Sequence, residues 1–282
     1  MNRLTVRGLT QGRSSLLWTK GKFGNFQSAI EKLKLQLHQI TKLSFHTLFS
    51  GGLFRFITSP FLDFVYPPIC VSCKLALRDG SQKVCEECWN SIERISRDHP
   101  LYVETREKLL AAGTVSDLVS VYVFQKEGAF QHIAHALKYD GFESVGRQLG
   151  ERLGMTMKAW DIHADVLIPI PLHKAKQRER GFNQAERIAC GVASVTGVEV
   201  CPDAVRRVKH TQTQTQLDSD ERKKNVEAAF AFDPSCSKRI SGKICVLIDD
   251  VITTGATIDS CAEELKSAGA SHVIAASAAL AQ

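Results

Sequence analysis

The segment Cys245-Val-Leu-Ile-Asp-Asp-Val-Ile-Thr-Thr-Gly-Ala-Thr257 joins an apolar run, an acidic pair and a small Thr/Gly segment. The run from Val246 to Ile248 is short, apolar and partly β-branched, which predicts a buried strand of a parallel sheet. Asp249 and Asp250 follow at the carboxyl end of that strand, where open α/β sheets bind ligands. The residues after them lead into a helical pattern. We therefore predict a strand, a ligand-binding turn and a helix in succession.

The chemistry of this turn indicates a phosphorylated sugar. Small residues before a helix let backbone N–H groups and threonine hydroxyls surround a phosphate, and the helix N-terminus adds favourable partial charge. The acidic pair repels phosphate, so it should meet hydroxyl groups or a metal ion. A ligand that combines phosphates, a polyol and Mg²⁺ is phosphoribosyl pyrophosphate (PRPP). The alternative is an ordinary strand-turn-helix with a solvated acidic turn.

The pattern resembles the PRPP-binding signature of type I phosphoribosyltransferases, in which two acids follow an apolar strand and a T-T-G-A-T segment comes next. This resemblance implies that Asp249 and Asp250 hold the ribose 2′- and 3′-hydroxyls and are the catalytic pair, spreading charge near the anomeric carbon. It also implies that the 5′-phosphate is bound by Thr253, Thr254, Gly255, Ala256 and Thr257.

A second segment, residues 165–184, also begins as a strand and then becomes strongly cationic. Pro169 and Pro171 end the hydrogen bonding of the strand. Four cations follow within seven residues, and we expect a charged loop there. If both segments share one sheet edge, these cations meet the pyrophosphate of PRPP and stabilise the charge that grows on the leaving group. The candidate pyrophosphate ligands are Lys174, Arg178 and Arg180; the alternative is a solvated charge run at a helix start.

Two C-x2-C motifs, Cys70/Cys73 and Cys85/Cys88, are separated by eleven residues. Paired thiolates on two turns supply the four soft ligands that tetrahedral Zn²⁺ favours. We expect a closed structural zinc site, with free thiols or a redox pair as the alternative. The five other cysteines are expected to be small buried hydrophobic residues.

Strand and helix patterns alternate over the rest of the chain. This alternation predicts an α/β fold with a mostly parallel sheet, preceded by a small four-cysteine zinc-ribbon-like module. The strands are expected at 118–124, 166–170, 244–248 and 272–276, and the helices at 130–137, 141–157, 182–193 and 257–268.

Further motifs make the resemblance narrower. They are Pro169-x-Pro-Leu172 with Arg178-x-Arg-Gly-Phe-Asn-Gln184, the spaced polar pattern from Lys209 to Phe230, Ala136-Leu-Lys-Tyr-Asp-Gly141, and Tyr66-Pro-Pro68 before the cysteines. Together they resemble the competence protein F (ComF) family over residues 61–280. The resemblance implies a phosphoribosyltransferase-like protein associated with DNA uptake, with single-stranded DNA and DNA-uptake proteins as candidate partners. The domains then run over 1–60 (a basic, amphipathic extension), 61–98 (the zinc-binding module) and 115–282 (the phosphoribosyltransferase-like domain).

Charge and hydropathy limit the remaining classes. The net charge of +6 comes from residues 1–45, which hold eight Lys/Arg and one acid. No apolar stretch reaches the length of about 18 residues needed to span a bilayer. We expect a cytoplasmic protein. The extension could lie on the inner face of the membrane, lie on the body of the protein, or result from a start codon placed too far upstream.

Two functions remain open on the sequence. The first is an enzyme that transfers phosphoribose from PRPP, with Mg²⁺, to an unidentified acceptor. The second is a non-catalytic accessory protein of the DNA-uptake machinery that responds to PRPP or binds single-stranded DNA or a partner. Residues 209–225 fit a flap over PRPP, contacts to a nucleic-acid backbone, or an exposed linker.

Overall fold

The computed structural model describes residues 68–78, 82–139, 141–208 and 229–281. The chain divides into two compact units, residues 1–65 and 66–282, and the described residues all belong to the second. The predictions for the N-terminal extension and for the 209–225 segment fall outside the described residues. The division into three domains stays a prediction. Within the described ranges, no helix is both long enough and apolar enough to cross a membrane.

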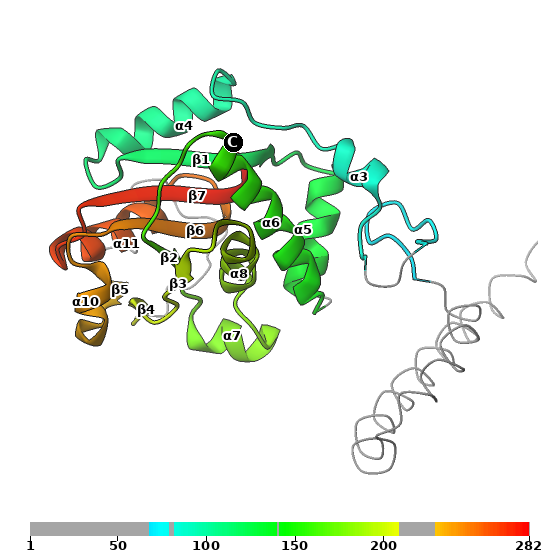
Figure 1. Ribbon diagram of the computed structural model, residues 1–282. Coiled ribbons are helices and arrows are strands. Elements are labelled where there is room, and N and C mark those ends of the chain that lie inside the picture. Colours follow the sequence, from blue (N-terminus) through cyan, green and yellow to red (C-terminus); the bar gives the residue numbers. More distant parts are fainter. Residues whose placement is uncertain (1–67, 79–81, 140, 209–228, 282) are drawn as a thin grey trace, which may run out of the picture. The chain divides into compact units, whose positions relative to one another are not determined.

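A five-stranded parallel sheet forms the centre of the second unit, in the order β1-β7-β6-β2-β3. Figure 1 shows the first four strands one below another in this order. The fold is α/β, as predicted, because apolar strands alternate with helices that are long enough to cross back over the sheet. The strands are β1 (Asp117–Val123), β2 (Val166–Pro169), β3 (Glu199–Val200), β6 (Ile244–Ile252) and β7 (His272–Leu280).

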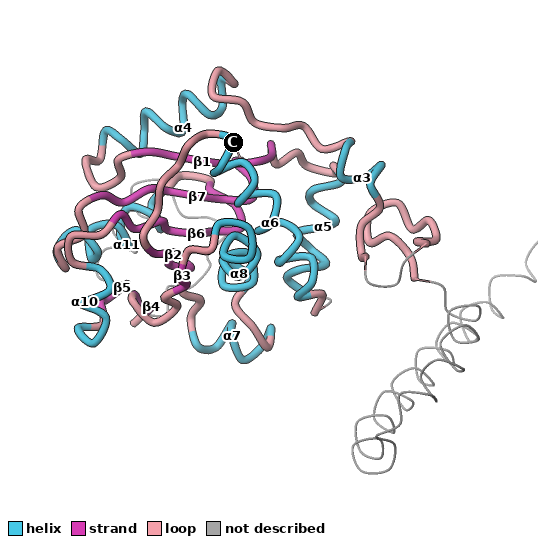
Figure 2. The backbone as a smooth tube through the Cα atoms, in the orientation of Figure 1, coloured by secondary structure: helices cyan, strands magenta, loops and turns pink. Residues whose placement is uncertain are grey.

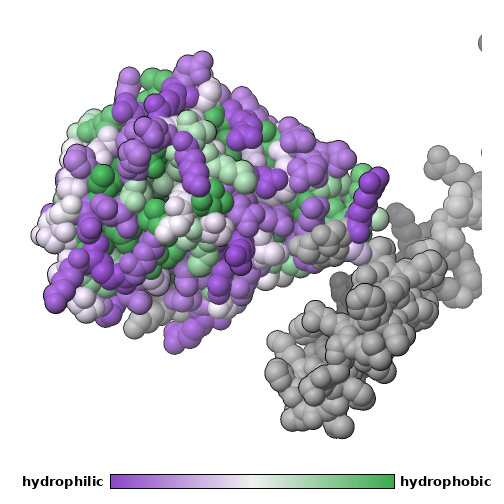
Figure 3. Space-filling view, viewed as in Figure 1, coloured by the Kyte–Doolittle hydropathy of each residue, from purple (hydrophilic) through white to green (hydrophobic). Residues whose placement is uncertain are grey.

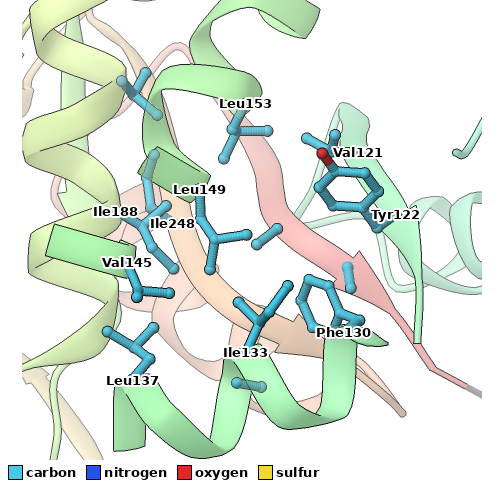
Figure 4. Close-up of a cluster of buried hydrophobic side chains, with 14 of the residues drawn as sticks. Val121, Tyr122, Phe130, Ile133, Leu137, Val145, Leu149, Leu153, Ile188 and Ile248 are labelled. Carbon is cyan, nitrogen blue, oxygen red and sulfur yellow. The ribbon is translucent and has the colours of Figure 1, made fainter. Parts of the chain in front are cut away.

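Helices cover both faces of the sheet, and the side chains of β6 show how the faces divide. Val246 and Ile248 join the hydrophobic core that lies under three helices, whereas Cys245 and Leu247 join the core on the other face. This alternation follows from the two-residue repeat of a strand. Figure 4 shows Ile248 beside the leucines of α6. The first face carries α5 (Ala129–Tyr139), α6 (Glu143–Ala159) and α8 (Gln184–Thr196), and the second carries α4 (Pro100–Ala111) and α11 (Ala256–Ser267).

The four-cysteine segment packs into the first of these cores. Cys88 and Trp89 lie on the short helix α3 (Glu86–Asn90) and are buried. The Trp89 ring stacks on Tyr122 of β1 at a centroid distance of 6.2 Å, and the guanidinium carbon of Arg152 lies 4.1 Å from the Trp89 ring centroid. The segment therefore shares apolar contacts with the sheet and with α6.

The connector between α3 and α4 runs along β1 as a loop (Figure 2). Arg94 forms an antiparallel bridge with Tyr122, and the N–H of Val123 donates to the carbonyl of Glu93 at 2.9 Å. These backbone hydrogen bonds hold the connector beside the carboxyl end of β1.

The remaining elements are short. β4 (Val205–Arg207) and β5 (Phe230–Phe232) form an antiparallel pair; in the sequence, β4 comes before residues 209–228 and β5 comes after them. A 3-10 turn η1 (Pro234–Cys236) and the helix α10 (Ser237–Ile240) then lead into β6. Hydrophilic side chains spread over much of the face shown in Figure 3.

Candidate functional site

The two segments singled out in the sequence meet at one edge of the sheet. β2 and β6 are neighbours, Pro169 pairs with Ile248, and the N–H of Ile170 donates to the carbonyl of Ile248 at 2.8 Å. Because the strands are parallel, the cationic residues after β2 and the acidic pair at the end of β6 emerge on the same side. This juxtaposition brings a cationic helix and an acidic pair to the same end of the sheet.

The acidic pair lies inside β6, which continues to Ile252, so the predicted strand end at Ile248 was wrong. Val251 and Ile252 pair with Ala279 and Leu280 of β7 and extend the ladder beyond the acids. The extension is stable because Ile252 is buried, while the two aspartates are partly buried near the carboxyl end of β6.

Successive strand residues point to opposite faces, so the two carboxylates have different neighbours. Asp250 Oδ2 lies 2.5 Å from Lys138 Nζ, at the end of α5. Asp249 lies toward the face with α11 and β4, where it acts electrostatically on Cys261 and on Arg207. The N–H of Asp250 donates to Asp249 Oδ1 at 2.8 Å and fixes the orientation of that carboxylate.

The Asp249 carboxyl is poised to change its charge near neutral pH. Burial and the neighbouring charge of Asp250 raise the pKa of Asp249 to about 8, and Lys138 opposes the increase. Desolvation disfavours the ionised form, and a like charge nearby adds to that effect. A ligand that brings hydroxyl donors or a cation to this carboxylate favours its ionised form.

The 253–257 segment forms a tight turn into α11. Gly255 adopts a left-handed conformation with φ of 81° at the position before the helix. A Cβ atom there would lie 2.6 Å from Cδ2 of Leu109 on α4. Thr253 and Thr254 are exposed, and Ala256 begins the helix. The turn therefore presents hydroxyls and a helix N-terminus to solvent, as an anion site requires.

The cations after β2 lie on a helix, α7 (Lys174–Arg180), so the expectation of a charged loop was wrong. The His173 side chain caps its first turn by accepting from the N–H of Ala175, and Gly181 ends it with φ of 82°. Lysine, arginine, glutamine and glutamate favour helix formation between such caps. The Arg178 side chain is exposed and that of Arg180 is half-buried.

Lys176, Arg207 and Lys138, which the sequence did not assign to the site, lie close enough to Arg180 to act on one another electrostatically. Burial lowers the pKa of Lys176, and the positive charges of Arg180, Arg207 and Lys138 lower it further. The guanidinium of Arg180 also lies over the Tyr139 ring, 5.5 Å from its centroid. Four cations from α5, α7 and β4 therefore act on one another at the edge that carries the acidic pair. Lys138 lies in the Ala136–Gly141 motif, which the sequence analysis used only as part of the family resemblance and to which it gave no function.

The four thiols of the cysteine motifs form one cluster. The four Sγ atoms lie within 4.8 Å of one another, and those of Cys73 and Cys85 are 3.7 Å apart. Tetrahedral Zn²⁺ with bonds of about 2.3 Å places its thiolates about 3.8 Å apart. Although burial opposes it, backbone N–H groups lower the pKa of Cys70 to about 6, whereas burial raises the pKa of Cys85 and of Cys88. The cluster is consistent with a structural zinc site.

The expectation for the other five cysteines holds in four cases. Cys201, Cys236, Cys245 and Cys261 are buried. Cys190 is exposed on α8, because it lies on the side of the helix that faces away from the sheet, so that expectation was wrong for Cys190.

Two domain families match this chain. A phosphoribosyl transferase domain matches residues 180–281, and a double zinc ribbon domain matches residues 61–99. The first match includes the acidic pair and the Thr/Gly turn, and the second includes all four clustered cysteines. The phosphoribosyltransferase domain implies a PRPP-like ligand.

Curated relatives match over much of the chain. DNA utilization protein YhgH of Salmonella typhi is 32% identical over 220 residues, which cover 73% of this chain and 94% of that protein. Competence protein ComFC of Bacillus subtilis is 27% identical over 197 residues, covering 67% of this chain and 74% of the relative. Competence protein F of Haemophilus influenzae is 32% identical over 109 residues, or 39% of this chain, and the match spans about half (47%) of that relative.

Among solved structures, the glutamine PRPP amidotransferase of Bacillus subtilis is 21% identical and matches with a TM-score of 0.32, covering 46% of this chain and 25% of that chain. This score is below the level at which a shared fold can be inferred. The identity and coverage of the YhgH relatives, together with the two domain matches, are sufficient for assignment. The chain belongs to the competence protein F (ComF) family of phosphoribosyltransferase-domain proteins.

Proposed function

We propose that this protein binds PRPP at the carboxyl edge of β6 and β2 and transfers its phosphoribosyl group to an acceptor, releasing pyrophosphate. One observation carries the proposal. The parallel pairing of β2 with β6 brings a cationic helix, an acidic pair and a helix N-terminus to one edge. These are the three kinds of group that a pyrophosphate, a ribose and a 5′-phosphate need.

The roles follow the chemistry of each group. Asp249 and Asp250 accept hydrogen bonds from the ribose 2′- and 3′-hydroxyls, which holds the sugar ring over the end of β6. The Lys138 ion pair with Asp250 fixes one of these carboxylates and offsets part of the negative charge. The residues of the 253–257 turn bind the 5′-phosphate through backbone N–H groups and threonine hydroxyls.

The cations act on the leaving group. In the transfer, the bond between C1 and the pyrophosphate oxygen breaks, and its electron pair leaves with the pyrophosphate. Lys174, Arg178 and Arg180 hold that group, and the half-buried Lys176 lies among them on α7. Positive charge aimed at the place where negative charge develops lowers the barrier. The burial that lowers the pKa of Lys176 also weakens its solvation, so the free site favours an anion.

Metal ions have two separate places in this proposal. Mg²⁺ accompanies the pyrophosphate of PRPP and supplies charge neutralisation when bound. Zn²⁺ is structural, held by Cys70, Cys73, Cys85 and Cys88, whose atoms fit a closed four-thiolate site.

We also infer that the activity serves the handling of DNA. The support is the names of the relatives, which are competence and DNA utilization proteins. Single-stranded DNA and DNA-uptake proteins are therefore candidate partners. A protein that binds PRPP without turning it over remains the alternative, as a PRPP-responsive accessory protein.

Binding and turnover are tested separately on the full chain. We expect PRPP with Mg²⁺ to bind, and Asp250→Asn and Arg180→Ala each to weaken the binding by about tenfold or more, since each removes a charge-assisted contact. The matched controls are Asp161→Asn, with its side chain 90% exposed before β2, and Arg147→Ala, 64% exposed on α6. Pyrophosphate release with purine and pyrimidine bases and with single-stranded DNA then measures transfer. PRPP binding without any release supports the accessory alternative, and equal affinity in all four variants contradicts the proposed site.

A further inference from the structure

Gln184 is a buried side chain that uses only part of its hydrogen-bonding capacity. It is the first residue of α8 and is 3% exposed. Its Oε1 accepts a hydrogen bond from Nη1 of Arg180 at 3.1 Å. Within the described ranges, no atom accepts a hydrogen bond from its Nε2. A buried donor without an acceptor destabilises the folded chain, so this amide requires an explanation.

The orientation of the amide follows from its neighbour. A guanidinium group only donates hydrogen bonds, so the amide atom that faces Arg180 must be the oxygen. An exchange of the amide oxygen and nitrogen would set two donors against each other. The unpaired group of Gln184 is therefore the amino group, which can donate two hydrogen bonds.

The backbone at Gln184 is fixed to the edge formed by β2 and β6. Asn183 caps α8 by accepting from the N–H of Ala185 at 3.1 Å, and its Nδ2 donates to the carbonyl of Ile170 at 3.0 Å. The N–H of Ile170 in turn donates to the carbonyl of Ile248, directly before the acidic pair. These hydrogen bonds place the start of α8 at the candidate site.

The surroundings of the unpaired amino group are cationic. Arg180, which contacts the amide, lies with Lys138 and Arg207 close enough to Lys176 to act on it electrostatically. The N-terminus of α8 adds partial positive charge. None of these groups has a lone pair to offer Nε2, whereas an anionic oxygen would be attracted by all of them.

Three carboxylates on neighbouring elements do not supply the missing acceptor. They are Glu179, exposed on α7, Glu186, half-buried in the first turn of α8, and Asp250, which pairs with Lys138. None of them accepts from Gln184 in the described part of the chain. The acceptor therefore has to come from a group that binds at this edge.

The choice of an amide also points to a ligand. If the side chain served only to hold Arg180, glutamate at this position would hold it more strongly, through a charge-assisted hydrogen bond between opposite charges. Glutamate would, however, repel an anion and would have no donor for it. An amide holds the guanidinium and leaves a donor for an anionic oxygen.

We propose that Gln184 binds the pyrophosphate of PRPP directly, through a hydrogen bond from Nε2 to one of its oxygens, while Oε1 holds Arg180 against the same group. The inference rests on the proposed function. The donor finds its acceptor only when the pyrophosphate is present, so Gln184 helps the site to distinguish PRPP from ribose 5-phosphate. Gln184 transfers no proton. Its hydrogen bond strengthens as the C1–O bond breaks and the electron pair moves onto the pyrophosphate.

Calorimetric titrations of PRPP, ribose 5-phosphate and pyrophosphate into the full chain with Mg²⁺ test this role. Gln184→Met keeps the approximate length of the side chain and removes both amide heteroatoms. We expect it to weaken PRPP and pyrophosphate binding by about tenfold, through loss of a charge-assisted hydrogen bond, and to leave the affinity for ribose 5-phosphate within about twofold of the wild type. Equal losses for PRPP and ribose 5-phosphate, or no loss for PRPP, overturn the inference.

A double-mutant cycle separates direct binding from an effect through Arg180. In the Arg180→Ala background, Gln184→Met should still weaken PRPP binding by more than about twofold, because Nε2 has its own contact with the ligand. A change within about twofold in that background means that Gln184 acts only by holding Arg180, and it overturns the inference.

Gln148→Met is the matched control, since Gln148 is a half-buried glutamine on α6. It should leave the affinity for all these ligands unchanged. If the wild type does not bind PRPP, the proposed function fails and this inference fails with it. If the wild type binds PRPP and Gln184→Met binds it equally well, only this inference fails.

Discussion

Asp249→Asn should stabilise the protein at alkaline pH while it weakens PRPP binding by at least about tenfold. In the folded chain, burial and Asp250 raise the pKa of Asp249 from its ordinary value of 3.8 to about 8. Because the unfolded chain releases this proton at a lower pH than the folded chain, ionisation of the carboxyl favours the unfolded state. The folded state is therefore most stable, as far as this group is concerned, below about pH 4, and it loses stability as the pH rises from about 4 towards 8. Asparagine keeps an oxygen that can accept from the N–H of Asp250 and cannot ionise.

The size of the gain follows from the pKa. Each tenfold change in proton affinity corresponds to about 1.4 kcal/mol, so the full difference sets an upper limit of about 6 kcal/mol. Asp249 is only partly buried at the carboxyl end of β6, and solvent screening there reduces this figure to about 2 kcal/mol. We therefore expect Asp249→Asn to be more stable than the wild type by about 2 kcal/mol at pH 8.5 and by less than about 0.5 kcal/mol at pH 4.

Urea unfolding at several pH values measures this difference, with m-values compared to confirm a common transition. Asp161→Asn serves as the control, because its carboxylate is 90% exposed and a surface change of this kind shifts stability by less than about 0.5 kcal/mol. A gain of equal size at pH 4 and pH 8.5, or no gain at pH 8.5, contradicts the reasoning. Loss of binding with a gain of stability would mark Asp249 as a residue retained for function.

Three more predictions concern the surroundings of the site. Lys138→Gln removes the cation that lowers the pKa of Asp249, so the pH at which PRPP affinity rises should be higher than in the wild type. Calorimetric titrations of PRPP between about pH 6 and about pH 9.5 measure this shift. An unchanged pH profile contradicts the role given to Lys138. Gly255→Ala places a side chain on a left-handed residue and against Leu109, so it should lower the free energy of unfolding by about 1–2 kcal/mol and weaken PRPP binding. Gly113→Ala is the control, because Gly113 is also left-handed but has open space around it. Equal effects of the two changes on binding would contradict the role of the 253–257 turn in phosphate binding. Trp89→Ala should lower the free energy of unfolding by about 3–5 kcal/mol, because Trp89 packs on Tyr122 of β1. For the same reason, removal of zinc by a chelator should lower the melting temperature of the whole unit. A zinc-free protein that melts at the same temperature as the metal-bound form contradicts this.

The sequence predicted the sheet class correctly because that class depends on local patterns, and the same patterns were used to place the proposed phosphoribosyl site. Val246–Ile248 form a sharp apolar run, and the acids and glycine after it are unusual neighbours for a buried strand. The end of the strand was predicted too early. A strand can continue through polar residues at its carboxyl end when the residues after them, here Val251 and Ile252, pair with a neighbouring strand, here β7. The helix α7 was missed because its charged residues suggest a loop, and its cap at His173 is a weak signal in a sequence.

Contacts between distant residues were beyond local reasoning. Lys138 joins the candidate site because α5 ends beside β6, where Lys138 pairs with Asp250. Arg207 joins it because β4 brings this side chain within the electrostatic influence of Asp249. Such a site appears only when the chain is folded.

A calorimetric titration of PRPP into the full chain, with and without Mg²⁺, decides whether the edge formed by β2 and β6 is a phosphoribosyl site. We predict saturable binding at one site per chain with Mg²⁺, an affinity at least about tenfold lower for Asp249→Asn, and an unchanged affinity for Asp161→Asn. No binding heat at millimolar PRPP, or equal affinity of Asp249→Asn and the wild type, would contradict the account.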